Sequence, residues 1–392
     1  MRSLNAVVSP LLLSVIGELA EKDGISFEKV ARAVVELSLL FTKERAALGR
    51  PYLEGPVLAS AYLQYFLPVN LSKIRMLLDE IPVLKVGEQF SVLDLGSGPG
   101  TGALAVLDWW HERRETDALS IVAVDCSSVV HRQARHLWDH YCRIAGIAKA
   151  SFRTCEGDIE RNAWFGQVGK GAPFDLIILA NSLNEMYADV KDPIASRAGL
   201  MTDVLSLLAP QGTLMIVEPA LRDTSRALHQ VRDRLLQEKR CTVYSPCLHE
   251  KNCPALVHPD DWCHEERPWE PPPAIQQIDE VVGFIKDALK FSYLLLRKDG
   301  KTIIERRSDI YRVVSELREL KGEKRAWLCN EQGRQEVGRQ DRLTSPQNTA
   351  LDRWHRGAIV QIERIVRKER AGKLSSLGRI EQDVGVQIIR PV

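Results

Sequence analysis

Two groups of residues in this sequence have types and spacings that suit chemistry. The first is a glycine-rich stretch at 92–102, which reads Val-Leu-Asp-Leu-Gly-Ser-Gly-Pro-Gly-Thr-Gly. Glycines let a ligand approach the backbone, and the start of a following helix offers free N–H groups. The second group is a set of four cysteines, Cys247, Cys253, Cys263 and Cys329. Because thiolates bind soft metals and iron–sulfur clusters, we expect a nucleotide-like cofactor site followed by a metal site.

The spacing of the glycines indicates which cofactor the loop binds. A dinucleotide fingerprint needs a glycine three positions after Gly98, where this chain has Thr101. The spacing present, Asp-x-Gly-x-Gly-x-Gly, is typical of S-adenosylmethionine sites, and Asp94 would accept the ammonium of the methionine part, directly or through water. The loop residues predicted to bind S-adenosylmethionine are Asp94, Gly96, Ser97, Gly98 and Gly100.

Further candidate site residues follow the next expected strands. Asp125, with Cys126 beside it, ends the second strand, where a carboxylate accepts both ribose hydroxyls. Asp158 follows the third strand and would receive the adenine amino group, and Asn181 follows the fourth, beside the cofactor. Asn181 and Glu185 are the candidate catalytic residues. A degenerate domain that binds nothing is the alternative, and the intact glycines and Asp125 argue against it.

The spacing of the four cysteines leaves several kinds of site open. Three of them lie within 17 positions, in a segment rich in proline, histidine and tryptophan. Structural zinc usually uses short Cys-x2–4-Cys pairs, and these cysteines form none. Wide spacing with Cys-Pro favours an iron–sulfur cluster over zinc, and free thiols are a third possibility. The other four cysteines are scattered, as in a reducing cytoplasm.

The elements that must position these residues follow an alternating pattern. Short apolar runs separated by helical stretches imply a parallel sheet covered on both faces. The expected strands are 91–95, 121–124, 151–154, 174–179, 212–217 and 291–297, and the expected helices are 101–113, 129–145, 195–208, 222–239 and 274–290. The fold class is therefore α/β, a Rossmann-like class I S-adenosylmethionine-dependent methyltransferase sheet.

The chain of 392 residues is long enough for two or three domains. Residues 1–80 have helical spacing and predict an N-terminal helical domain. Residues 81–335 form the methyltransferase-like domain, and 241–273 together with Cys329 form its metal-cluster element. Residues 336–392 are expected to form a basic C-terminal module with strands at 357–366 and 384–389.

Charge is uneven along the chain. The net charge is +1, but the residues from Arg297 onward contain 22 Lys and Arg against 14 Asp and Glu. A basic C-terminal third predicts a surface that faces a polyanion, although a solvated helix face is the alternative. No stretch approaches 18 uninterrupted apolar residues, so we expect no membrane span, and we expect a monomer in the cytoplasm.

Several stretches together resemble one known family. They are the glycine loop at 93–102, Asn-Ser-Leu-Asn-Glu at 181–185, Val-Glu-Pro at 217–219, the Cys-Pro and Asp-Trp-Cys-His motifs within 245–264, and Leu-Cys-Asn-Glu-Gln-Gly at 328–333. The chain resembles the methyltransferase-like assembly proteins of the mitochondrial small ribosomal subunit and their bacterial relatives, and looks like a bacterial-type member. The resemblance implies a seven-stranded core, a 4Fe-4S cluster on Cys247, Cys253, Cys263 and Cys329, and association with the small ribosomal subunit and its ribosomal RNA.

Three functions fit these observations. The first is a methyltransferase acting on small-subunit ribosomal RNA in ribosome assembly or translation. The second is a non-catalytic RNA-binding assembly factor that uses the cofactor fold as a scaffold. The third is a small-molecule methyltransferase with a structural zinc site.

Overall fold

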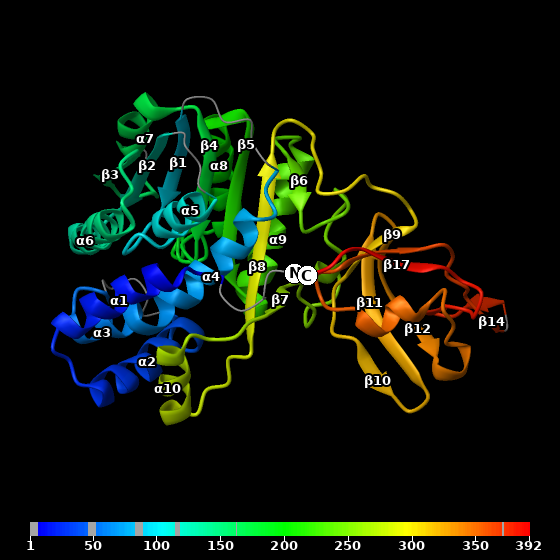
Figure 1. Ribbon diagram of the computed structural model, residues 1–392. Coiled ribbons are helices and arrows are strands. Elements are labelled where there is room, and N and C mark those ends of the chain that lie inside the picture. Colours follow the sequence, from blue (N-terminus) through cyan, green and yellow to red (C-terminus); the bar gives the residue numbers. More distant parts are fainter. Residues whose placement is uncertain (1–6, 46–51, 83–88, 114–117, 162, 371) are drawn as a thin grey trace.

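Figure 1 shows the computed structural model of the protein, which describes residues 7–45, 52–82, 89–113, 118–161, 163–370 and 372–392. A helical layer, a central sheet and a second, smaller sheet follow one another along the chain. In the view of Figure 1 the N-terminal helices lie below the central sheet, and the C-terminal sheet lies to one side of it.

The central sheet has the strand order of a class I methyltransferase. Its order is β3-β2-β1-β4-β5-β8-β6, with β7 also paired to β8. The strands β1 to β5 pair with one another in parallel, whereas β8 is antiparallel to β5. The strands are β1 (Gln89–Leu95), β2 (Ala118–Asp125), β3 (Ala150–Glu156), β4 (Phe174–Ala180), β5 (Leu208–Pro219), β6 (Thr242–Ser245), β7 (Glu265–Pro268) and β8 (Ala288–Arg297). The predicted fold class is confirmed.

Both faces of this sheet are buried, which explains its near-continuous apolar strands. Val92 of β1 belongs to a hydrophobic cluster that includes the N-terminal helices, and the next residue, Leu93, belongs to the cluster on the other face. The helices of the domain are α5 (Thr101–Glu112), α6 (Ser128–Ala145), α7 (Ala163–Val168), α8 (Pro193–Ser206), α9 (Arg222–Gln237) and α10 (Pro273–Val282). α5 and α6 pack in the first cluster, α8 and α9 in the second.

Helices occupy the described part of 1–80, as the sequence indicates. They are α1 (Pro10–Lys22), α2 (Phe27–Thr42), α3 (Pro56–Ala61), a π-helical turn (Tyr62–Phe66) and α4 (Leu67–Leu78). Ser9 caps α1, and its backbone N–H donates to Asp108 of α5 at 3.1 Å. Tyr141 of α6 donates to the same carboxylate at 2.7 Å. This buried contact fixes the helical layer on the central domain.

The expected helix at 274–290 is shorter than predicted. α10 ends at Val282 because Gly283, at φ +73°, takes the left-handed cap position that glycine favours. The chain then runs to β8, and this segment carries Lys286. The cysteine-rich segment is tied to the central sheet, since β6 and β7 at its two ends both pair with β8.

A second sheet forms the C-terminal part of the protein, and it begins at Ile310, earlier in the chain than residue 336. Its order is β16-β12-β11-β9-β13-β17, with β10 paired to β11. The strands are β9 (Ile310–Val313), β10 (Arg318–Leu320), β11 (Glu323–Asn330), β12 (Gly333–Gln340), β13 (Ile359–Ile362), β16 (Leu377–Arg379) and β17 (Val386–Arg390), and β14 (Glu369–Arg370) pairs with β15 (Lys373–Leu374). β13 and β17 confirm the strands expected at 357–366 and 384–389.

None of the helices in the described parts of the chain is both long and apolar enough to cross a membrane.

Candidate functional site

The glycine loop joins β1 to α5 in a conformation that only glycine adopts easily. Gly96, Gly98 and Gly100 have φ values of +67°, +50° and +87°. A Cβ atom at Gly96 would lie 2.5 Å from the Cβ of Ser182, so a side chain does not fit there. The backbone N–H groups of Gly96 and Ser97 donate to the carbonyl of Val124, which fixes the loop against β2.

Asp125 at the end of β2 is held against this loop. Its Oδ2 accepts a hydrogen bond from the Gly98 N–H at 2.9 Å, and its Oδ1 accepts one from the Ser127 N–H at 3.0 Å. Each carboxylate oxygen retains acceptor capacity for a ligand hydroxyl. The arrangement therefore presents a fixed carboxylate next to a bare backbone turn, as the sequence predicts.

A cavity of about 910 Å³ opens beside this loop. All the predicted cofactor-contacting residues that follow β2, β3 and β4 line it, together with Asp94 and the loop from Gly96 to Gly98. The residues that follow the three strands are Asp125, Cys126, Asp158 and Asn181. Gly100 is the exception, since it is the N-cap of α5 and packs against Ala134.

Two buried hydroxyls at the cavity indicate that it suits a polar ligand. The Oγ atoms of Ser97 and Ser127 are buried, and neither has a hydrogen-bond partner within the described residues. Buried polar groups are nearly always paired, so orphan hydroxyls in a cavity wall point to a missing partner. With the glycine turn and the Asp125 carboxylate, they fit the ribose and amino-acid parts of S-adenosylmethionine.

Asp94, which the sequence predicts to accept the ammonium of the methionine part, packs against the start of α5 in the structure. It is only 1% exposed, and its Oδ2 accepts the backbone N–H of Ala103 at 2.9 Å. A Cβ atom at Gly102 would lie 2.6 Å from its Oδ1, so the carboxylate packs against the first turn of α5. Burial raises the pKa of Asp94 to about 7. Its clearest task is to position the loop and the helix start.

The loop after β4 forms the opposite wall of the cavity. Asn181 has a left-handed backbone, with φ +58°, and its N–H donates to Val217 of β5 at 2.7 Å. Glu185 is half-buried, and burial raises its pKa to about 7 although Arg45 opposes the shift. Arg45 also donates to the side-chain oxygen of Asn184 across the cavity rim. The two candidate catalytic residues therefore line the same cavity as the glycine loop.

The helical layer supplies a wall that the sequence did not reveal. Tyr62 and Phe66, whose rings stack with centroids 6.0 Å apart, line the cavity from the π-helical turn. Lys73 of α4 and Lys286 before β8 line it as well. Aromatic residues at helical spacing ordinarily indicate a hydrophobic core, so the sequence did not identify Tyr62 and Phe66 as cavity residues. The one local signal for this wall of the cavity is the lysine-bearing segment that follows the C-cap of α10.

The four predicted metal-binding cysteines line a second, smaller cavity of about 50 Å³. Cys247 follows β6, Cys253 precedes a short 3-10 turn, Cys263 precedes β7, and Cys329 lies on β11 of the second sheet. All are free thiols, and burial raises the pKa of Cys263 to about 11 and that of Cys253 further. The structure thus brings together residues up to 82 positions apart that the sequence singled out.

Arginines of α9 hold the loop that carries these cysteines. Arg226 donates to the carbonyls of Ala255, at 3.0 Å, and Asp261, at 2.7 Å. Arg232 donates to the His249 carbonyl at 2.6 Å. These contacts shape the loop without using the thiols. Within the described ranges, no set of three or more His, Cys, Asp or Glu side chains is arranged to hold one metal ion.

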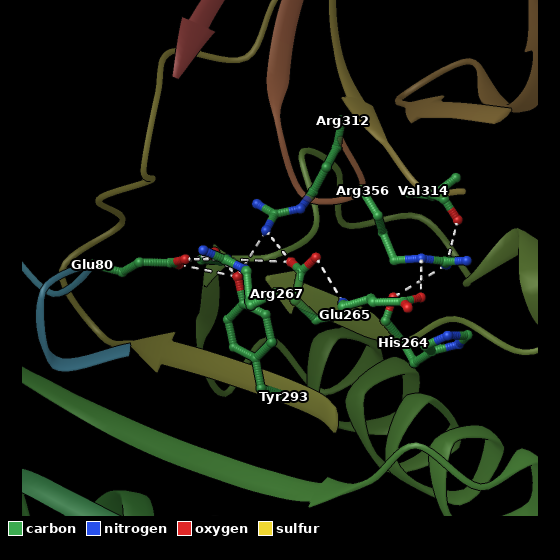
Figure 2. Close-up of polar contacts among 10 residues, drawn as sticks. Glu80, His264, Glu265, Arg267, Tyr293, Arg312, Val314 and Arg356 are labelled. Atoms are coloured by element: carbon green, nitrogen blue, oxygen red, sulfur yellow. Dashed lines mark hydrogen bonds and ion pairs between the residues drawn. The ribbon is translucent and has the colours of Figure 1, made fainter. Parts of the chain in front are cut away.

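A buried charge network next to the cysteine cavity joins the three parts of the protein (Figure 2). Glu265 of β7 accepts from Arg312 of β9, and Arg267 bridges Glu265 to Glu80 at the end of the helical layer. Tyr293 of β8 donates to Glu80 at 3.0 Å. Nearby cationic guanidiniums outweigh burial and lower the pKa of Glu265 and Glu80. The network fixes the second sheet, which carries Cys329, against the segment that carries Cys263.

Solved structures with low overall similarity to this chain include several methyltransferases. The fibrillarin/Nop5p complex shares 14% identity at a TM-score of 0.31, with 58% of this chain and 82% of that chain covered. The small RNA methyltransferase HEN1 shares 14% at a TM-score of 0.38, covering 60% of this chain and 26% of that one. The S-adenosylhomocysteine-bound methyltransferase PaMTH1 of Podospora anserina shares 19% at a TM-score of 0.29, covering 41% and 68%. These overall similarities are low, and the fold assignment rests on the strand order.

The family assignment comes from a sequence model. No curated protein matches this chain. The family model described as "Mitochondrial small ribosomal subunit Rsm22" matches residues 56–340, which include the glycine loop and all four cysteines. That match covers well over half of the 392 residues. The chain belongs to the Rsm22 family.

Proposed function

We propose that this protein binds S-adenosylmethionine in the large cavity and transfers its methyl group to RNA of the small ribosomal subunit. The observation that carries the proposal is the carboxylate of Asp125, fixed by the Gly98 N–H at 2.9 Å beside a turn in which no side chain fits at Gly96. Such a carboxylate pairs with the two ribose hydroxyls of an adenosine cofactor.

The cavity residues divide between the two ends of this ligand. Asp158 and Cys126 lie beyond Asp125 along the strand ends and would contact the adenine. Ser97, with its unpartnered hydroxyl, and Gly98 would contact the amino-acid part. Asp94 would act mainly by holding the start of α5.

Methyl transfer needs an acceptor atom aligned with the methyl group and a place for its proton. The donor supplies an electrophilic methyl group when bound. Glu185 would accept the proton, because a carboxyl with a pKa of about 7 exists in both protonation states at neutral pH. Asn181 would position the acceptor, since its left-handed backbone is fixed on β5.

The family and the charge of the chain support the acceptor that we propose. The description of the family names the mitochondrial small ribosomal subunit. We propose that the ribosomal RNA of the small subunit is the methyl acceptor. The excess of cationic residues after Arg297 would contact phosphates. We propose that the protein is a bacterial-type member of the family and that it acts as a monomer in the cytoplasm.

We also propose that Cys247, Cys253, Cys263 and Cys329 hold a 4Fe-4S cluster. The four thiols line one cavity although they come from separate segments, and two of these segments belong to different sheets. A cubane cluster binds each thiolate at a different iron, so the sulfurs need not converge on one point as they must around zinc.

A non-catalytic RNA-binding assembly factor is the second candidate. The contact between Arg45 and Asn184 lies at the cavity rim beside the candidate catalytic residues. An acceptor nucleotide would have to pass this contact, and a cavity closed there would bind the cofactor without transferring its methyl group.

Transfer of a labelled methyl group to ribosomal RNA separates the two candidates. The RNA is taken from small subunits of cells that lack the protein, and the enzyme is purified without oxygen. We expect label in the RNA with the parent and a loss of about 100-fold or more with Glu185→Gln, within the range for a general base. Binding of S-adenosylhomocysteine without any labelling by the parent would favour the assembly factor.

A further inference from the structure

Two lysines line the large cavity from different parts of the fold, and neither forms an ion pair within the described residues. Lys73 comes from α4 and Lys286 from the segment between α10 and β8. The Nζ of Lys73 donates to the side-chain oxygen of Asn70 at 3.0 Å. The Nζ of Lys286 lies 4.5 Å from the ring centroid of Tyr65. Neither forms an ion pair with a carboxylate among the described residues, whereas Lys290, which also lines the cavity, pairs with Glu266.

The two charges are costly in the ligand-free protein. Burial, and after it the charge of Lys286, lower the pKa of Lys73 to about 7. Burial also lowers the pKa of Lys286 to about 8, against the attraction of Asp279 on α10. Half-buried cations without a counterion are unfavourable unless a ligand supplies the anion. The pair therefore has the properties of an anion site.

The position of the pair indicates which ligand carries the anion. β8 is antiparallel to β5, with Phe291 opposite Pro219, so Lys286 lies near the edge where β5 ends. This is the edge at which the loops after the parallel strands meet the cofactor cavity. The stacked rings of Tyr62 and Phe66 line the same cavity. Aromatic faces next to lysines suit a nucleotide, whose base stacks while its phosphate meets the cations.

We propose that Lys73 and Lys286 bind a phosphate of the nucleic-acid acceptor, inside the cavity that also holds the methyl donor. This inference rests on the proposed function, because it names the part of the acceptor that the same cavity recognises. It adds a subsite distinct from the glycine loop and Asp125. The phosphate would restore the charged state of both lysines and position the adjoining nucleotide toward Asn181 and Glu185.

The carboxylate of the methyl donor is the other anion that could bind the two lysines. The affinities of ligands with and without this carboxylate distinguish the two assignments. We would measure S-adenosylhomocysteine, 5′-methylthioadenosine, which has no carboxylate, and a random single-stranded RNA pentamer against the parent, Lys73→Met/Lys286→Met and the exposed control Lys170→Met. We expect the double variant to bind the pentamer at least tenfold more weakly and S-adenosylhomocysteine within twofold of the parent. The control should match the parent for every ligand.

Two results would overturn the phosphate site. One is weaker binding of S-adenosylhomocysteine with unchanged binding of 5′-methylthioadenosine, which would assign the pair to the donor's carboxylate. The other is unchanged affinity of the double variant for all three ligands. Failure of the parent to bind S-adenosylhomocysteine would refute the proposed function instead, and the pentamer measured without it would still test the lysines. A lysine pKa that rises when pentamer is added, followed by NMR, gives a readout independent of affinity.

Discussion

Arg312 of β9 and Glu265 of β7 form a buried ion pair, 2.5 Å between nitrogen and oxygen, that joins the C-terminal sheet to the central sheet. Both side chains are almost fully buried, at 6% and 4% exposure. Arg267, Glu80 and Tyr293 complete the network on the side of the helical layer. The sheet carrying Cys329 is therefore held by buried charges, none of which can be removed alone without leaving the remaining charges unbalanced.

Arg312→Met should therefore destabilise the protein by about 3 kcal/mol, because it leaves two buried carboxylates with only the Arg267 guanidinium to offset their charge. The matched control is Arg307→Met, since Arg307 pairs with Asp309 at the surface and such a pair contributes about 0–1 kcal/mol. Urea unfolding of the two variants measures the difference. Equal effects would mean that the network does not hold the two sheets together.

Replacement of any one of Cys247, Cys253, Cys263 or Cys329 by serine should remove the visible absorption and most of the iron and sulfide from protein purified without oxygen. A thiolate ligand is lost in each case, and the segment that carries Cys247, Cys253 and Cys263 has little apolar core of its own. Cys155→Ser is the control, because that buried thiol lies on β3 away from the cavity. Stoichiometric zinc with neither iron nor sulfide in the parent would favour the zinc site instead.

The charge of Lys73 should make the ligand-free protein less stable at neutral pH than in alkaline solution. Its folded-state pKa of about 7 lies below the ordinary value of about 10.4, so the unfolded chain binds the extra proton between these two values. The destabilisation is complete below pH 7 and disappears above about pH 10. Lys73→Met should raise the urea midpoint at pH 6.5 and leave it nearly unchanged at pH 10, and Lys170→Met should raise it at neither. A Lys73→Met midpoint unchanged at both values would contradict the buried charge.

RNA contacts on the second sheet should come from its exposed cations that lack ion pairs. Lys321, Arg342 and Arg353 are exposed, and none pairs with a carboxylate among the described residues. Lys321→Glu/Arg342→Glu should weaken ribosomal RNA binding and reduce the log–log salt slope by about 1.5, since each lost contact accounts for about 0.7 to 0.9. Arg364→Glu is the control, because Arg364 already pairs with Asp383. Unchanged affinity and slope in the double variant would move the RNA surface elsewhere.

The sequence predicted those features that local motifs encode. The glycine turn, the strand before it and Asp125 lie where expected, because each depends on a few adjacent residues. Lys73 and Lys286 were missed because only the packing of α4 and the α10–β8 segment brings them to the cavity. The four cysteines were found as a group, although the place of Cys329 on a second sheet was not.

The count of charged residues in the sequence overestimates the charge available for binding RNA. Much of the cationic excess after Arg297 is engaged within the fold. Arg297, Arg312 and Arg339 are almost fully buried and pair with Asp299, Glu265 and Asp352. Composition counts such residues as surface charge because it has no information about burial. Truncation of the chain before Gly357 would remove β13, an interior strand of the second sheet, so substitutions test the RNA surface better.

Binding of S-adenosylhomocysteine, measured by calorimetry, tests the central claim most directly. We expect the parent to bind one molecule, and Asp125→Ala to bind about 10- to 100-fold more weakly, the range for losing a charged hydrogen-bond partner. Asp203→Ala, which removes an exposed carboxylate on α8, should match the parent. Affinity in Asp125→Ala equal to that of the parent, or no binding by the parent, would contradict the assignment of this cavity to the methyl donor.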